Sequence, residues 1–256
     1  MANAYLSLDT LKGTGALNVG TAYDTRLLSL IESVSRQVEG FCNRVFYFYN
    51  ETKKFNGNGS NELFTPDLIN IGTLQEDNNY DGTMDTNWAS TDFLMQPANA
   101  APTSDWGRPY SRIMVNPMSN GSQDAFLTGE QNYQIVGTWG FRKIVKDSGL
   151  NGTLTDGTTG SLVLTGSASG TIEVGHMLLV DAEQVYVTAY LGTSATVERA
   201  KNGSTGTVHL GVDVNIVQYP GPISEAVLIQ SARLWKRKDS GFASQIGLPE
   251  TGQLIV

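Results

Sequence analysis

The pattern of hydrophobic and polar positions predicts two helices near the start of the chain. Residues 5–12 have the pattern of a short helix that is capped by Ser7 and ended by the glycines after it. The clearest helical pattern covers residues 24–43, where the apolar side chains fall within an arc of about 120°. These apolar residues are Leu27, Leu30, Ile31, Val34, Val38, Phe41 and Cys42. Thr21 and Asp24 have the spacing of a capping box, and Cys42 is expected to be an inert core thiol.

Strands are expected through most of the following hundred residues. Residues 44–55 alternate aromatic and polar side chains, residues 56–60 have the composition of a hairpin turn, and residues 61–65 would form the second strand. Further strands are predicted at 68–76, 91–95, 113–115 and 131–138, with a long irregular loop at 97–109.

The character of the chain changes at about Lys146. Between residues 149 and 213 the aromatic residues become rare, and short Val-, Thr- and Leu-rich runs alternate with turns such as Asn202-Gly203. The sequence therefore predicts an α+β fold with an inserted all-β module, resembling a barrel or a sandwich, at 146–217. The host domain, residues 1–145 plus 218–256, would combine a small helical bundle with an antiparallel β-sheet.

A third helix is expected after Pro220, with Pro222 in its first turn and basic residues in its last turn. It carries two apolar stripes, and a helix on the surface of a monomer needs only one. The first stripe is Ile223, Val227 and Leu234, and the second is Leu228, Ala232 and Trp235. The second stripe would be buried either in the same domain or against another subunit.

The segment after this helix has three apolar anchors but little periodicity. The anchors are Phe242, Ile246 and Leu248. Such a tail is either disordered or docks into a partner. The last helical turns before it hold the basic cluster of the chain, which comprises Arg233, Lys236, Arg237 and Lys238.

Composition narrows the classes of function. The 256 residues have a net charge of −8, so the protein is poorly suited to gripping nucleic-acid phosphates. Its surface would suit a channel that DNA passes without sticking. The single cysteine excludes an internal disulfide framework, and we expect no membrane segment because no run of 18 apolar residues occurs.

Catalytic motifs are largely missing from the sequence. It contains no G-x-S-x-G, no P-loop, no H-E-x-x-H and no C-x-x-C, so we expect no enzyme activity. Both histidines, His176 and His209, lie in the inserted module. With Asp181 and Glu183 they would hold a metal if their strands converged; the alternative is isolated histidines on exposed strands.

One polar loop matches the first nine positions of a calcium-binding loop. Its oxygen ligands would be Asp77, Asn79, Asp81 and Asp85. Gly82 occupies the sixth position, but the twelfth, where a bidentate glutamate is needed, is Trp88. Asp92 would have to supply the missing carboxylate. The alternative is the polar tip of a β-hairpin, where Asn, Asp and Gly are favoured in any case.

Several segments, in this order and spacing, resemble the head–tail connector (adaptor) proteins of tailed bacteriophages. They are YLSLDTLK (5–12), DTRLLSLIESVSRQVE (24–39), FCNRVF (41–46), TDFL (91–94) with the loop from Pro97 to Asn99, VGTWGF (136–141), PISEAVL (222–228) and ARLWKR (232–237). The match covers most of residues 1–145 and 218–256. In shorter members of the family the VGTWGF-type strand leads almost directly into the last helix, so the insert at 146–217 is a departure.

The resemblance implies a structural virion protein rather than an enzyme. Such proteins form a homo-oligomeric ring, typically of twelve copies, below the portal protein; the ring continues the DNA exit channel and offers the attachment surface for neck, stopper or tail-completion proteins. The expected location is the neck of a virion assembled in the host cytoplasm. By this resemblance, the tail anchors and the basic last turn of the helix would bind the portal. The second apolar stripe would contact a neighbouring subunit. The alternative is a carbohydrate-binding or adhesive β-rich virion protein.

Overall fold

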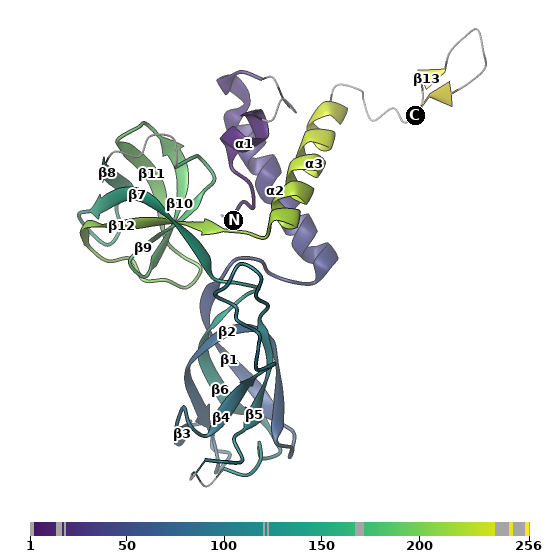
Figure 1. The fold of residues 1–256 in the computed structure, drawn as a ribbon, viewed down its shortest axis with the longest axis vertical. Coiled ribbons are helices and arrows are strands. Elements are labelled where there is room, and N and C mark those ends of the chain that lie inside the picture. Colours follow the sequence, from purple (N-terminus) through teal and green to yellow (C-terminus); the bar gives the residue numbers. More distant parts are fainter. Residues whose placement is uncertain are drawn as a thin grey trace.

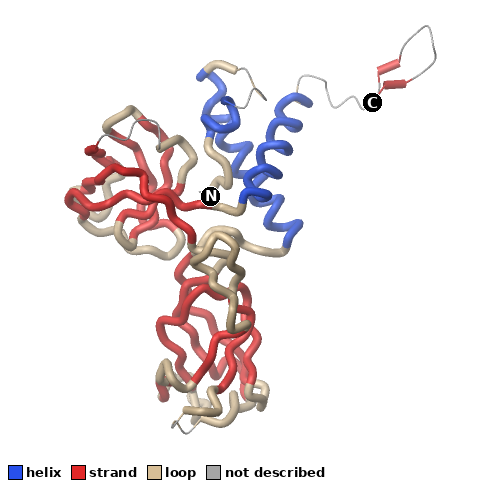
Figure 2. The backbone as a smooth tube through the Cα atoms, viewed as in Figure 1, coloured by secondary structure: helices blue, strands red, loops and turns tan. Residues whose placement is uncertain are grey.

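The computed structural model describes residues 3–13, 17, 19–119, 121, 123–166, 172–238, 246–247 and 254–255. Three helices stand beside a β-barrel, and a second β-structure extends away from both (Figures 1 and 2). Most of the fold is antiparallel β-sheet with few helices, which confirms an α+β, β-rich class. The small helical bundle expected from the sequence is not evident.

The helices are α1 (Leu8–Gly13), α2 (Asp24–Cys42) and α3 (Gly221–Arg237), with a short 3₁₀ turn, η1 (Thr21–Tyr23), before α2. Ser7 caps α1 by accepting a hydrogen bond from the backbone N–H of Thr10. The capping box expected at Thr21 and Asp24 does not form, because Thr21 belongs to the 3₁₀ turn and α2 has no side-chain cap bond at its start.

The end of α2 differs from its prediction. Leu27, Ile31 and Val34 are fully buried as expected, but Phe41 is 93% exposed and Cys42 is also exposed. The last turn of α2 extends past the elements that cover the rest of the helix (Figure 1). The prediction that Cys42 is a core thiol is therefore wrong.

The β-structure farthest from the helices is a six-stranded antiparallel sheet. Its strands are β1 (Tyr49–Gly57), β2 (Glu62–Glu76), β3 (Thr86–Trp88), β4 (Phe93–Gln96), β5 (Tyr110–Val115) and β6 (Gly129–Trp139). The spatial order is β1-β6-β2-β5-β4, with β3 paired to β2. The hairpin predicted around residues 56–60 is wrong, because β6 lies between β1 and β2 and pairs with both, and the first residues of β2 pair with β5.

The region after this sheet closes into a barrel. Its strands are β7 (Ile144–Leu154), β8 (Ser161–Gly166), β9 (Met177–Val180), β10 (Glu183–Tyr190), β11 (Ser194–Lys201) and β12 (His209–Gln218). They close in the order β10-β11-β8-β7-β12-β9. The all-β module expected at 146–217 thus lies within a closed barrel, which leaves no free sheet edge. A two-stranded pairing of β13 (Ile246–Gly247) with β14 (Leu254–Ile255) completes the elements.

Three apolar cores hold these parts together. One fills the barrel and one lies on the β1–β6 sheet around Trp139. The third joins the helices to the outer wall of the barrel, because Met177 and Tyr186 pack with Leu27 and Val227. One wall of the barrel therefore contributes to the helical core, while the barrel also has a core of its own. The residues of the expected host domain, 1–145 plus 218–256, contribute to two separate cores.

Candidate functional site

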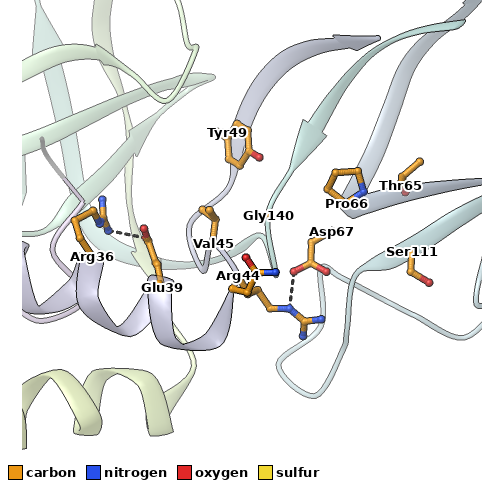
Figure 3. A pocket seen from close by; sticks show the side chains of 12 residues that line it. Arg36, Glu39, Arg44, Val45, Tyr49, Thr65, Pro66, Asp67, Ser111 and Gly140 are labelled. Atoms are coloured by element: carbon orange, nitrogen blue, oxygen red, sulfur yellow. Dashed lines mark ion pairs between the residues drawn. The ribbon is translucent and has the colours of Figure 1, made fainter. Parts of the chain in front are cut away.

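A cavity lies at the waist of the molecule, where the end of α2 meets the β1–β6 sheet (Figure 3). It has a volume of about 710 Å³. Its lining comes from the end of α2, the segment that follows it, and strands β1, β2 and β5. These residues are Arg36, Glu39, Gly40, Asn43, Arg44, Val45, Tyr49, Thr65, Pro66, Asp67, Ser111 and Gly140. We call it the waist groove.

Two ion pairs set the charge of the waist groove. Arg36 Nη2 lies 2.7 Å from Glu39 Oε1, and Arg44 Nε lies 2.8 Å from Asp67 Oδ2. Burial raises the pKa of Glu39, although the Tyr5 hydroxyl and Arg36 act in the opposite direction. Burial likewise raises the pKa of Asp67 against the effect of Arg44. The charges balance in pairs, so the groove does not favour a strongly charged ligand.

The waist groove offers little for catalysis. No histidine or cysteine lines it, and its hydroxyl groups belong to Tyr49, Thr65 and Ser111. Burial raises the pKa of Tyr49, although Lys53 lowers it, so this phenol stays protonated near neutral pH. A hydroxyl nucleophile needs an adjacent base, and the carboxylates of this groove are already held by arginines.

The acidic loop forms the tip of the β2–β3 hairpin. The structure brings Asp77, Asp81 and Asp85 together, with one oxygen of each within 4.8 Å of the others. Asp77 accepts hydrogen bonds from the backbone N–H groups of Asp81 and Gly82. The Asn79 side-chain oxygen accepts a hydrogen bond from the backbone N–H of Asp81 at 3.0 Å.

The missing twelfth calcium ligand is not supplied. Trp88, at that position, donates its indole N–H to the buried Glu76 at 2.9 Å. Asp92 accepts bonds from Ala89 N–H and from the Ser119 hydroxyl instead. Three carboxylates suit calcium chemically, but the side-chain to backbone hydrogen bonds of Asp77, Asn79 and Asp81 are also those of a polar hairpin tip.

A buried charged network closes one end of the barrel. Arg199 Nε and Nη2 donate to Glu183 Oε1 and Oε2 at 2.6 and 2.7 Å. The ring of His209, which is 4% exposed, lies between Asp181 Oδ2 at 2.8 Å and Glu183 Oε2 at 3.0 Å. The structure thus unites three of the four residues considered for a metal, but His176 lies elsewhere, beside Glu173.

Hydrogen bonding rather than metal binding explains this network. Burial raises the pKa of Glu183, but hydrogen bonds from Arg199, Ala200 N–H, His209 and Thr207 N–H together lower it to about 2. Glu183 Oε2 already faces Arg199, Thr207 N–H and His209. This leaves no lone pair for a metal ion.

The interface residues predicted on α3 divide into two groups. Ala232 and Trp235 are buried within the chain, Leu228 is half-buried, and Trp235 packs edge-on against Tyr23 at a ring-centroid distance of 5.4 Å. Ala232 and Trp235 are therefore covered within the chain itself and do not face a neighbouring subunit, whereas a contact of Leu228 with a neighbour stays a prediction. Arg233, Lys236 and Arg237 lie on the exposed side of α3.

Of the predicted tail anchors, Phe242 and Leu248 lie outside the described residues. The backbone of Ile246 pairs with Ile255. Within the part of the chain that the structure describes, no helix is long and apolar enough to cross a membrane.

Comparisons with protein-family models, curated proteins and solved structures find no match to this chain. Function must therefore be argued from the site and from the arrangement of the elements.

Sequence reasoning missed the residues that join the barrel to the sheet. Asn202 exchanges side-chain amide hydrogen bonds with Asn3, donates to Gln184 Oε1 at 2.7 Å, and accepts the N–H of Asn50 on its backbone oxygen at 2.8 Å. The Asn202-Gly203 dipeptide indicated a turn but not its partners, which lie far away in the sequence.

Proposed function

We propose that this chain is a structural subunit of a head–tail connector, forming a ring below a portal that continues the DNA exit channel and receives neck or tail proteins. Twelve copies would match the family that the sequence resembles. The supporting observation is that most of the resembling segments, which are far apart in the chain, pack into one core; TDFL (91–94) lies instead in the sheet, where Phe93 packs against the sheet core. Residues 5–12, 24–39, 41–46 and 222–237 all contribute to the helical core, and Phe141 of the VGTWGF segment packs against it.

In this proposal the portal binds the basic side of α3 and the segment after it. Arg233 and Lys236 are exposed, which supports this role. The C-terminal end of α3 points away from the β1–β6 sheet (Figure 1). Positive charge there would meet an acidic portal surface and raise the association rate.

The direct test is the particle mass of the full chain in solution, alone and with its portal. We expect a ring or a portal-bound complex, which Arg233→Glu with Lys236→Glu weakens. The control is Lys54→Glu with Lys146→Glu, two exposed lysines on other parts of the protein. A stable monomer that ignores portal would overturn the proposal.

The tail has its own test. Removing residues 240–256 should abolish portal binding, and unchanged binding would show that the tail is not the anchor. If the full chain ignored portal but bound glycans, the carbohydrate-binding alternative would replace the connector.

A further inference from the structure

The β1–β6 sheet joins the rest of the molecule through a neck of two short segments. One runs from Asn43 to Phe48 and the other from Gly140 to Lys143, and Phe141 N–H donates to Val45 C=O at 3.0 Å. Gly140 has a φ of 118°, and a β-carbon there would lie 2.1 Å from Tyr47 O. The two segments thus pass side by side at a point where only glycine fits.

The apolar contacts of this region lie in the neck itself and not on the strands beyond it. Phe46 and Phe48 of the neck are buried in the helical core, and Phe141 packs against it. Among the described residues, Ile69 is the one buried side chain of strands β1–β6 that belongs to the helical core. The waist groove, about 710 Å³, lies along the neck at Val45, Tyr49 and Gly140. A second cavity of about 440 Å³ extends from Tyr47 and Tyr49 to Gly203. Unfilled space beside the neck leaves room for rotation, and units without a large apolar interface move relative to each other by default.

A turn of the barrel contacts the sheet beside the neck. The backbone N–H of Asn50, in β1, donates a hydrogen bond to Asn202 C=O. Gly203 lies so close to the same strand that a β-carbon added to it would be 2.0 Å from Asn50 O. Gln184, in the barrel, also donates to Phe48 C=O at 3.0 Å. Because these contacts are polar and directional, they fix the angle between the sheet and the barrel while burying little apolar surface.

We propose that the β1–β6 sheet is a lever that pivots at the neck, and that the barrel turn Asn202-Gly203 is the latch that holds its angle. The barrel would then have a mechanical role, setting the direction of the sheet relative to the helices. This inference does not depend on ring assembly, because every contact it uses lies within one chain.

The test measures distances between spin labels on the sheet and on α2. Labels at Thr25→Cys and Asn87→Cys, both exposed, would be placed in a Cys42→Ser background. Labelled chain diluted in excess unlabelled chain avoids signals between copies. The latch variant is Gly203→Ala, and the matched control is Gly192→Ala. Both glycines lie in barrel turns with nearly equal φ, 74° and 71°, but nothing lies within 4 Å of a β-carbon at Gly192.

Both variants carry the same backbone strain, and only Gly203→Ala displaces Asn50. We expect one narrow peak in the distribution of distances between the labels at positions 25 and 87, both without a glycine substitution and with Gly192→Ala. With Gly203→Ala we expect this peak to be lost. A label pair within the sheet, Thr52→Cys with Asn87→Cys, should stay unchanged in all three. An unchanged peak in Gly203→Ala, a broad distribution without any substitution, or a change within the sheet would each overturn the proposal.

Discussion

Replacing Glu183 by glutamine tests the buried network of the barrel most directly. Glu183→Gln keeps the shape of the side chain but removes the charge that faces Arg199, whose side chain is only 5% exposed. The pKa of Glu183 falls from its ordinary value of 4.5 to about 2 in the folded protein. This difference corresponds to about 3 kcal/mol of stability at neutral pH, in the range measured when one partner of a buried ion pair is removed.

The sign of the pH dependence follows from the lowered pKa. The contribution of the Glu183 carboxylate to the free energy of unfolding is fully present above pH 4.5 and is lost as the pH falls towards about 2. The variant should therefore be about 3 kcal/mol less stable than the parent at pH 7 and should differ much less near pH 2. A surface control in the same barrel is Glu198→Gln, whose partner is Lys201 and whose side chain is 51% exposed; it should cost less than about 1 kcal/mol.

Hydrogen exchange measured by mass spectrometry reports this loss segment by segment. All four tryptophans, Trp88, Trp106, Trp139 and Trp235, lie outside the barrel, so tryptophan fluorescence does not report on it directly. Because Met177 and Tyr186 pack with the helices, protection should fall together in the barrel and in α2, while the β1–β6 sheet keeps its own. If Glu183→Gln lowered the free energy of unfolding by less than about 1 kcal/mol, or by the same amount at pH 7 and pH 2, the reasoning would be refuted.

Three further predictions concern other parts of the chain. Trp235→Ala should destabilise the helical core by about 3–5 kcal/mol in urea unfolding, while Ile229→Ala, on the exposed side of α3, should cost much less; equal costs would contradict the burial of the second stripe. Cys42 should react with a thiol reagent in the native protein as fast as in urea, because it is exposed; strong native protection would restore the core-thiol prediction. Millimolar calcium should leave the melting temperature unchanged, because Trp88 replaces the twelfth ligand; a rise that Asp81→Asn abolishes would instead show a calcium site.

The sequence by itself determined the local elements. Apolar residues at helical spacing placed α2 and α3, and the change of composition near Lys146 located the β module to within a few residues of the barrel. For the network at Glu183, the sequence indicates Asp181, Glu183 and His209 as a group but gives no sign of Arg199. Such patterns are local because hydrogen-bond geometry and side-chain periodicity act within a few residues.

Only the tertiary structure decided which surfaces face each other. An apolar stripe shows that a residue is buried but not which surface covers it. The stripe alone is compatible with a neighbouring subunit at Trp235, whereas in the structure Tyr23 and the protein's own helical core cover this side chain. Glycine and asparagine at 202–203 indicated a turn, but its contact with Asn50 joins residues about 150 positions apart, beyond the reach of any local pattern. The separation of the sheet core from the helical core likewise depends on long-range packing, which sequence periodicity does not encode.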